Sequence, residues 1–330
     1  MNLVDFIKDF PDEESCKLHF KGLRDAQVKI CPKCGCTEYY WKNDKEMYEC
    51  KRCHYRMSLK KGTVMEHSQL TFRDWYVAFH LMSSTKKSIS ACELQRQLNK
   101  SCYRTVWELT QKIRDVMGQR DENYTLSNEV EIDEMFFETT CRTAPIKKSS
   151  GRLKRGVGSQ QQTKVLVMAE SVPVDDETRE AKEKKSGKKY RVKKSIGHIK
   201  MSVIGDLKSE TIKEEASKSI EEGSKVASDG TNSHVKLTSK YELDSKNEGN
   251  NVSEVVKEHL PWVHIVAGKC KKMIAGIHDQ VERFFLQLYL NEFCYKFNRR
   301  FFDDLFPRLL VAAVSYKPRF RHNFRKLVGN

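Results

Sequence analysis

Two Cys-x-x-Cys units near the start of the chain have the spacing of a metal site. Cys31 and Cys34 form the first unit, and Cys50 and Cys53 form the second after fifteen intervening residues. Tetrahedral zinc needs four soft donors that converge on one point, and each unit is a tight turn that presents two sulfurs. The four cysteines therefore predict a structural zinc site.

The residues around these cysteines predict a zinc ribbon. Aromatic residues from Tyr39 to Tyr48, typical of strands, lie between the two units. Cys36 and His54 stand beside the predicted ligands, but the spacing of the units excludes both. Six basic residues occur in the same segment: Lys33, Lys51, Arg52, Arg56, Lys60 and Lys61. A ribbon whose zinc is purely structural is therefore also compatible with docking onto DNA.

A second candidate site lies in the stretch Glu129–Phe137, which reads Glu-Val-Glu-Ile-Asp-Glu-Met-Phe-Phe. Its alternating apolar residues predict a strand with one buried face, and Asp133 lies on the opposite phase, close to Glu131 and Glu134. Carboxylates this close repel one another in water, and a divalent cation relieves the repulsion. An edge strand with a solvated acidic face is the alternative interpretation.

Asp229 is the second acid that could belong to this site. The segment Lys225–Asp229 is typical of a short strand that ends in a carboxylate before a glycine turn. If this strand lies beside the Asp133 strand, the two aspartates can share a pair of divalent ions. Two such ions about 4 Å apart activate an attacking water or 3′-hydroxyl and stabilise the oxygen that leaves a phosphodiester. An ordinary Asp-Gly turn is the alternative.

A long amphipathic helix is predicted from Val281 to Phe302. Apolar residues recur on it at spacings of three or four and are expected to face the core: Leu286, Leu290, Phe293, Phe297 and Phe301. A polar stripe on another face holds Glu292, Lys296 and Arg299 or Arg300.

The other elements of this half of the chain give an α/β order. Strands are predicted at 163–169, 198–204 and 261–266, helices at 206–221 and 269–277, and a loop at 241–259. This is the order of a ribonuclease H-like domain, in which helices flank a mixed five-stranded sheet and a late helix supplies a third ligand. The connections at 142–161 and 182–194 are strongly basic, which predicts solvated loops that could also clamp phosphates.

Two further segments are helical. Residues 1–28 predict two short helices around Pro11, and residues 67–124 predict three more. The sequence Ser90-Ala-Cys-Glu93 has the pattern of a capping box, in which serine and glutamate each bind a free backbone N–H. Two short helices with a tight turn, the second one basic, indicate a helix-turn-helix whose later helix could lie in a major groove. An ordinary three-helix bundle gives the same pattern.

The composition favours a nucleic-acid partner. The chain has 330 residues, and 60 Lys and Arg against 45 Asp and Glu give a net charge of +15, a balance that favours polyanions. The odd count of 11 cysteines argues for metal-binding thiolates in a reducing compartment and against a disulfide framework. The sequence shows neither a secretory signal nor an apolar run long enough to span a bilayer, so we expect a soluble, intracellular protein.

Four motifs together resemble one family of DNA-transposing enzymes. They are Ile-Asp-Glu at 132–134, Ser-Asp-Gly-Thr-Asn-Ser at 228–233, Leu-Pro-Trp-Val-His-Ile at 260–265 and Tyr-Leu-Asn-Glu-Phe-Cys-Tyr-Lys-Phe-Asn-Arg-Arg at 289–300. The chain resembles the DDE-type insertion-sequence transposases of the zinc-ribbon group, whose eukaryotic relatives are the Merlin transposons. The likeness runs from the Cys-x-x-Cys pairs to Ser315-Tyr-Lys317.

The resemblance implies a transposase that binds the terminal inverted repeats of its element. Metal-dependent hydrolysis at the element's ends would precede attack of the freed 3′-hydroxyl on target DNA. Asp133, Asp229 and Glu292 would bind two Mg²⁺ or Mn²⁺ ions, Lys296 would contact phosphate, and the zinc would be structural. The expected partners are double-stranded DNA and at least one further copy of the chain, with no membrane, and the expected location is the nucleoid-associated cytoplasm.

One position departs from the family pattern. After the Trp-Val-His-Ile segment the family generally has Asn, or an acid in some branches, where this chain has Lys269. Asn offers an oxygen to a cation, whereas an ammonium offers only donors and a like charge. Either Glu292 completes the site or this copy is catalytically impaired. The alternative function is a zinc-ribbon DNA-binding protein without chemistry, and only the three acids Asp133, Asp229 and Glu292 separate the two.

These interpretations divide the chain into five segments. They are an N-terminal helical segment at 1–28, the zinc ribbon at 29–66, a helix-turn-helix region at 67–124, a ribonuclease H-like transposase domain at 125–317 and a basic tail at 318–330. The transposase domain carries a basic insertion at about 142–197.

Overall fold

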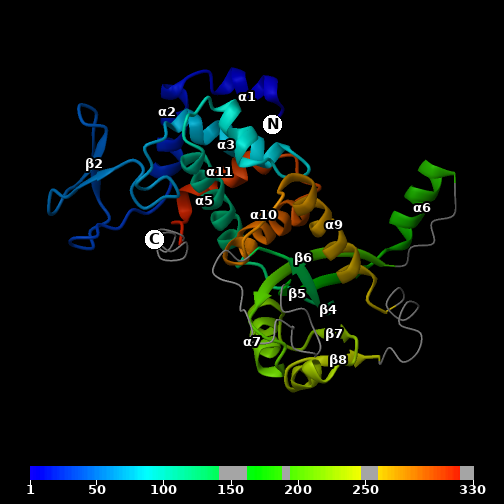
Figure 1. The fold of residues 1–330 in the computed structure, drawn as a ribbon. Helices are drawn as coiled ribbons and strands as arrows, with labels where there is room; N and C mark the ends of the chain where they lie inside the picture. The colour runs from blue at the N-terminus through cyan, green and yellow to red at the C-terminus, as the bar shows by residue number, and fades with distance from the viewer. Residues whose placement is uncertain (141–161, 188–193, 247–258, 320–330) are drawn as a thin grey trace, which may run out of the picture. The chain divides into compact units, whose positions relative to one another are not determined.

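The computed structural model describes residues 1–140, 162–187, 194–246 and 259–319. The chain folds as two compact units, here called unit 1 and unit 2 (Figure 1). Unit 1 contains residues 1–120 and the described residues from Arg299 on, and unit 2 contains residues 121–298. The sequence predicts a transposase domain at 125–317, whereas in the structure the chain returns to unit 1 after Asn298.

The ribbon of unit 1 is a small antiparallel sheet. Its strands are β1 (Tyr39–Lys42), β2 (Met47–Cys50) and β3 (Arg56–Ser58). Helix α2 (Glu13–Asp25) is attached to it, because the Tyr48 hydroxyl donates to Asp25 Oδ1 at 2.6 Å and the Lys21 ammonium lies 4.8 Å above the Trp41 ring. These strands confirm the predicted ribbon.

A helical core completes unit 1. Its helices are α1 (Leu3–Asp9), α3 (Phe72–Ser84), α4 (Ala91–Gln97), α5 (Tyr103–Asp121) and α11 (Leu305–Ser315). The Phe306 ring of α11 lies 5.6 Å from Phe6 and 5.8 Å from Phe10, and Ala313 accepts a hydrogen bond from the Val64 N–H at 3.0 Å. Both predicted helical segments are therefore present, and the C-terminal helix belongs to the same core.

A tight turn joins α4 to α5. Ser90 Oγ caps α4 by accepting the Glu93 N–H at 3.1 Å, which is one half of the predicted capping box. The Glu93 carboxylate accepts from Arg96 Nε at 3.1 Å and from Gln97 Nε2 at 2.8 Å instead of closing the box. Asn99 adopts the left-handed conformation with φ 49°, which a short polar side chain tolerates better than most residues. The two helices are thus joined by the short connection that a helix-turn-helix needs.

Unit 2 is built on a mixed five-stranded sheet. Its strands are β4 (Glu129–Glu138), β5 (Gln162–Pro173), β6 (Lys194–Ile204), β7 (Lys225–Ser228) and β8 (Glu242–Ser245). Their order in space is β6-β5-β4-β7-β8. Strand β5 is antiparallel to both β4 and β6, whereas β7 is parallel to both β4 and β8. The predicted α/β class and the mixed sheet are confirmed.

Helices lie on both faces of this sheet (Figure 1). They include α7 (Ser209–Ser219), α9 (Pro261–Ile277) and α10 (Leu286–Asn298). Val130 and Ile132 of β4 pack with Ile212 of α7 in one apolar core. Because side chains alternate along a strand, Glu131 and Asp133 point to the other face, which α9 and α10 cover.

The segment at 261–266 is helical, so the predicted strand is wrong. Pro261 occupies the first turn of α9, where a missing N–H is tolerated. Val263, Val266 and Cys270 are buried at spacings of three and four along one helix that ends at Ile277. A short apolar run does not by itself distinguish a buried strand from a buried helix.

The fifth strand comes from the segment predicted as a loop. Strand β8 pairs in parallel with β7, and Leu243 lies opposite Val226. The prediction failed because an edge strand is attached by its backbone hydrogen bonds and needs few apolar side chains. The loop prediction is therefore wrong at 242–245, and residues 247–258 lie outside the described residues.

The predicted helix from Val281 to Phe302 is shorter at both ends in the structure. A short 3₁₀ turn, η2 (Arg283–Phe285), precedes α10, which ends at Asn298. Asn298 Oδ1 accepts the Ile199 N–H at 2.8 Å and its Nδ2 donates to the Ile199 carbonyl at 3.0 Å, which ties the helix end to β6. Phe301, expected to face the core, is 83% exposed.

The described residues of the lysine-rich segment 182–194 belong mostly to regular elements. Helix α6 (Asp176–Ser186) extends into it, and Lys194 begins β6 and pairs with Glu129. The predicted basic loop at 142–161, residues 188–193 and the tail from 320 on lie outside the described residues. Among the helices that are described, none combines the length and the apolar character needed to cross a membrane.

Candidate functional site

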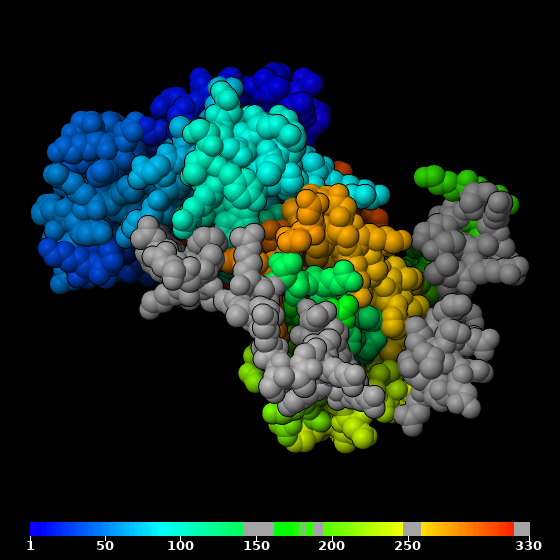
Figure 2. All heavy atoms as spheres, viewed as in Figure 1, coloured from blue at the N-terminus to red at the C-terminus, as the bar shows by residue number. Residues whose placement is uncertain are grey.

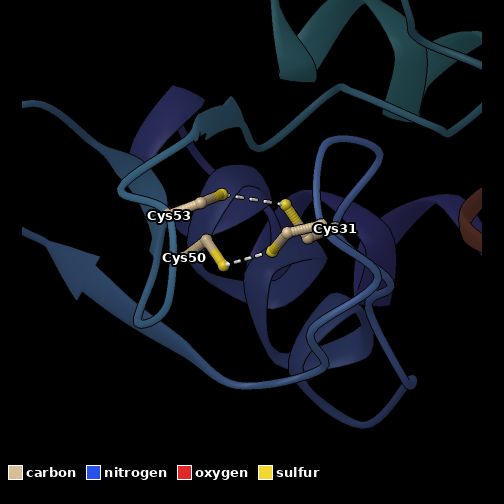
Figure 3. Close-up of side chains that lie close together, drawn as sticks. Cys31, Cys50 and Cys53 are labelled. Atoms are coloured by element: carbon tan, nitrogen blue, oxygen red, sulfur yellow. Dashed lines mark hydrogen bonds between the residues drawn. The ribbon is translucent and has the colours of Figure 1, made fainter.

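The four cysteines of the ribbon converge on one point. The Sγ atoms of Cys31 and Cys53 lie 3.6 Å apart, as do those of Cys34 and Cys50 (Figure 3). All four sulfurs lie within 4.8 Å of one another. With Zn–S bonds of about 2.3 Å, the sulfurs of a zinc tetrathiolate are about 3.8 Å apart. Both the donor type and the spacing therefore fit Zn²⁺.

The two neighbours that the spacing excludes have other contacts. Cys36 Sγ accepts the Glu38 N–H at 3.4 Å, and His54 Nδ1 lies 3.5 Å from Glu49 Oε1. Neither belongs to the four-cysteine group. The ribbon thus matches the sequence-based ligand set.

Strand pairing brings Asp133 and Asp229 together. Glu131 of β4 lies opposite Ala227 of β7 in a parallel ladder. Asp133 and Asp229 each follow two residues later, so they have the same phase and lie next to each other across the strands. Ligand oxygens of Asp133, Asp229 and Glu134 lie within 4.8 Å of one another. We call these three residues the acidic site.

The carboxylates of the acidic site repel one another. Burial, assisted by the charges of Asp229 and Glu134, raises the pKa of Asp133 to about 7. Carboxylate oxygens are hard donors of the kind that Mg²⁺ and Mn²⁺ bind in proteins. The donor set and its charge therefore fit a divalent cation.

A buried histidine supports two of the acids. His234, on the 3₁₀ helix η1 (Asn232–Ser239), has Nδ1 3.1 Å from Asp229 Oδ1 and Nε2 3.4 Å from Glu134 Oε1. Burial lowers the pKa of His234, but the contacts with the two carboxylates outweigh it and raise the pKa to about 9. Burial likewise opposes ionisation of Asp229, but its bond with His234 holds the Asp229 pKa below its ordinary value. His234 therefore pairs with Asp229, while its Nε2 lies near Glu134 without a hydrogen bond, and Glu134 Oε1 accepts the Ser233 hydroxyl at 3.0 Å.

Helix α9 begins directly beside the acidic site. The Glu131 carboxylate accepts the Trp262 N–H at 2.7 Å and the Val263 N–H at 3.1 Å. One residue later, His264 Nε2 lies 3.4 Å from Asp133 Oδ2. Burial and the nearby Lys271 charge lower the pKa of His264, whereas burial raises that of Glu131 to about 7.

The third predicted acid lies elsewhere. Glu292 is completely buried in α10 and accepts a hydrogen bond at 2.9 Å from Lys296, which is 8% exposed. Glu292 is not part of the acidic site. The polar stripe predicted on this helix exists, but it forms an internal ion pair, so the structure brings together Asp133 and Asp229 without Glu292.

Lys269 also lies outside the acidic site. It is exposed on α9, with its ammonium 5.8 Å from the centre of the Phe297 ring. Two further lysines of the same helix, Lys271 and Lys272, are exposed as well. The outward edge of α9 is therefore basic, and Figure 2 shows α9, in orange, at the surface.

Sequence reasoning missed His234 and His264. Both stand in or beside the motifs that carry the family resemblance, His234 directly after Ser-Asp-Gly-Thr-Asn-Ser and His264 within Leu-Pro-Trp-Val-His-Ile. A helical interpretation of the second motif, which begins with a proline, would have placed His264 on the first turn of a helix. Asp229 lies only five positions before His234, but the approaches to Glu134 and Asp133 do not follow from sequence spacing, since these residues are 100 and 131 positions away from their histidines.

Two family models match the chain. An ISXO2-like transposase domain matches residues 125–298, more than half of the chain and nearly all of unit 2. The chain belongs to this transposase family. A transposase zinc-ribbon domain matches residues 11–56, which include α2 and the four cysteines. The resemblance to zinc-ribbon insertion-sequence transposases is thus confirmed.

A relative from a mobile element supports this assignment. The uncharacterized protein in transposable element ISH50 of Halobacterium salinarum is 28% identical over 169 residues, which are 49% of this chain and 55% of the relative. The chain thus spans about half the length of that relative. No solved structure matches this transposase.

Proposed function

We propose that this transposase cleaves DNA at the terminal inverted repeats of its insertion sequence and transfers the freed ends to target DNA. The observation that carries the proposal is the acidic site, in which the parallel ladder of β4 and β7 places Asp133 beside Asp229. The strand order and the covering helices support a ribonuclease H-like fold for unit 2.

The acidic site would hold two Mg²⁺ or Mn²⁺ ions. Asp133 and Asp229 would be ligands, and Glu134 is better placed than Glu292 to be the third acid. Bound ions activate an attacking water or 3′-hydroxyl and stabilise the oxygen that leaves the phosphodiester. Protein residues would orient this site: His234 would hold Asp229, Ser233 Oγ donates to Glu134 Oε1 at 3.0 Å, and the backbone N–H of Glu134 donates to Asp133 Oδ1 at 2.7 Å.

Basic side chains would hold the DNA backbone near the acids. The exposed lysines of α9, Lys269, Lys271 and Lys272, are suited to phosphate contacts. The sequence-based candidate for this role, Lys296, is buried with Glu292, and we assign that pair a structural role. Lys269 would then be one phosphate contact among several, with no requirement for an oxygen ligand at this position.

Unit 1 would bind the terminal repeats as double-stranded DNA. The first residues of α5, Tyr103, Arg104 and Thr105, are exposed directly after the tight turn from α4. This is the position from which the recognition helix of a helix-turn-helix contacts base edges in the major groove. The ribbon zinc would be structural, and a dimer or larger assembly would bring two ends together.

The test is strand cleavage of DNA that carries the ends of the element, with Mn²⁺ as the metal. Wild type should nick this DNA, and Asp133→Asn should bind it without nicking. Glu138→Gln is the matched control, because it removes one negative charge from an exposed position of the same strand and should cleave normally. Equal nicking by wild type and Asp133→Asn would contradict the proposal.

Catalytic impairment of this copy is tested with the same assay. If Lys269 prevents metal binding, Lys269→Asn should raise cleavage well above wild type. Unchanged cleavage would show that Lys269 does not limit the reaction. Binding of the terminal repeats without cleavage by either protein would favour a DNA-binding role without chemistry.

A further inference from the structure

We propose that His264 is a nitrogen ligand of the metal ion held by Asp133, and that Glu131 positions it there. This inference rests on the proposed function, because it adds a ligand to the acidic site. Because position 269 holds a lysine where the family generally has Asn, α9 supplies no oxygen donor to the site from that position. The structure offers a different donor, His264, from the same helix and five positions nearer to its start.

The two oxygens of Asp133 face different partners. Asp133 Oδ1 accepts the backbone N–H of Glu134 at 2.7 Å, whereas Oδ2 lies 3.4 Å from His264 Nε2. The His264 side chain is 38% exposed, so an ion or a phosphate can reach the space beside it. Asp133 thus belongs to the acidic site and also faces the imidazole of His264.

Glu131 determines where α9 begins. Leu260, the N-cap residue, makes no side-chain hydrogen bond to the helix. The 3% exposed Glu131 carboxylate takes its place and accepts the N–H groups of Trp262 and Val263. A carboxylate in this position also interacts favourably with the helix dipole. The cap of α9 is therefore supplied by the strand that carries Asp133.

A second contact holds the first turn of α9 on the sheet. Trp262 Nε1 donates to Ser171 Oγ of β5 at 3.3 Å. The turn is thus fixed to two adjacent strands, and His264 follows immediately. Glu131 and Asp133 lie on the same face of β4, two residues apart, so a helix capped by the first places its next turn over the second.

A nitrogen ligand would leave a chemical signature. Imidazole binds Mn²⁺ more readily than Mg²⁺, which prefers an all-oxygen set. Mn²⁺ is paramagnetic, and a directly bound nitrogen modulates its electron spin echo. Binding of Mn²⁺ to the full-length protein, followed by electron paramagnetic resonance, therefore reports on His264 without any measurement of cleavage.

The first experiment compares wild type with His264→Gln. Wild type should bind Mn²⁺ in an Asp133-dependent manner and show nitrogen modulation that changes when the histidines carry ¹⁵N. His264→Gln should lose the modulation and bind Mn²⁺ about tenfold more weakly or worse. His198→Gln is the matched control, because His198 Nδ1 also faces a carboxylate, Glu170 Oε2 at 3.2 Å, and it should behave as wild type.

The second experiment tests the positioning residue. Glu131→Ala removes the cap and should weaken both the nitrogen modulation and Mn²⁺ binding, the latter by roughly tenfold. Glu131→Gln keeps an acceptor oxygen for the N–H groups of Trp262 and Val263 and should restore both. If Glu131 only stabilised the fold, the Mn²⁺ that remains bound to the Glu131→Ala protein would keep the nitrogen modulation of wild type.

The outcomes separate this inference from the proposed function. Asp133-dependent Mn²⁺ binding without nitrogen modulation, or with modulation that survives in His264→Gln, would overturn the role of His264 and leave the proposed function intact. The labelled wild type gives this answer even if a variant does not fold. If Mn²⁺ binding does not depend on Asp133, both the inference and the proposed function fail.

Discussion

The ribbon and the acidic site bring their candidate metal ligands together in opposite ways. The ribbon takes its four sulfurs from one segment, 31–53, and each pair of ligands comes from a single turn. The acidic site takes Asp133 from β4 and Asp229 from the end of β7, with Glu131 of β4 placing α9 beside them. The first site depends on local spacing, and the second depends on the register of a sheet.

This difference determines what each site tolerates. A metal site built from one short segment needs only its ligands and the ion, because the free energy of ion binding also stabilises the fold of that segment. A site assembled by a sheet needs the apolar core behind it, because the core sets where the strands lie. Substitutions in the apolar core, away from the carboxylates, should therefore weaken metal binding at the acidic site. Zinc binding by the ribbon should change mainly when one of its ligands is replaced.

The largest effect is expected from loss of one zinc ligand. Cys50→Ser leaves three thiolates around the ion, and because structural zinc contributes on the order of 10 kcal/mol to folding, the ribbon should release zinc and unfold. Metal analysis and amide hydrogen exchange of residues 39–58 measure this. Cys36→Ser is the control and should retain zinc. Loss of Mn²⁺ binding by unit 2 in the Cys50→Ser protein would show that the two sites are not independent.

Removing one partner of the buried Glu292–Lys296 pair should have the next largest effect. Lys296→Ala leaves a carboxylate buried at 0% exposure and should lower the free energy of unfolding by about 3–5 kcal/mol, as measured by urea denaturation. The double variant Glu292→Gln, Lys296→Met should be less destabilised. If Glu292→Gln alone abolished Mn²⁺ binding, Glu292 would belong to the metal site after all.

Truncating the core behind the acidic site should weaken it indirectly. Ile132 is completely buried between Glu131 and Asp133, on the α7 face of β4. Ile132→Ala should lower the free energy of unfolding by about 3 kcal/mol and weaken Mn²⁺ binding through the altered strand position. Val172→Ala, at a 43% exposed position of β5, should change stability by less than about 0.5 kcal/mol. Unaltered Mn²⁺ affinity in Ile132→Ala would argue against a site set by sheet register.

The smallest effect is expected where the ribbon meets α2. Tyr48→Phe removes the 2.6 Å hydrogen bond to Asp25 and should cost about 1 kcal/mol, measured as a shift of the thermal midpoint, with full zinc content. Tyr40→Phe, at a 52% exposed position, should have no effect. If Tyr48→Phe released zinc, the ribbon would depend on α2 as much as the acidic site depends on its sheet.

Sequence patterns predicted elements well where one face of the element is apolar. The alternation in β4 and the helical periodicity of α3, α5 and α7 gave the correct element types, because these patterns reflect burial on one side. Prediction failed at the first turn of α9 and at β8. In both, the decisive interactions are backbone hydrogen bonds to distant residues, to Glu131 for α9 and to β7 for β8.

The sequence by itself determined the four candidate zinc ligands, because two turns with fixed spacing present all four sulfurs. It also determined that Asp133 lies opposite the apolar face of its strand. Only the tertiary structure decided which residues meet Asp133. Asp229 and His264 are 96 and 131 positions away in sequence, and strand register and helix capping, which no local pattern encodes, bring them to it.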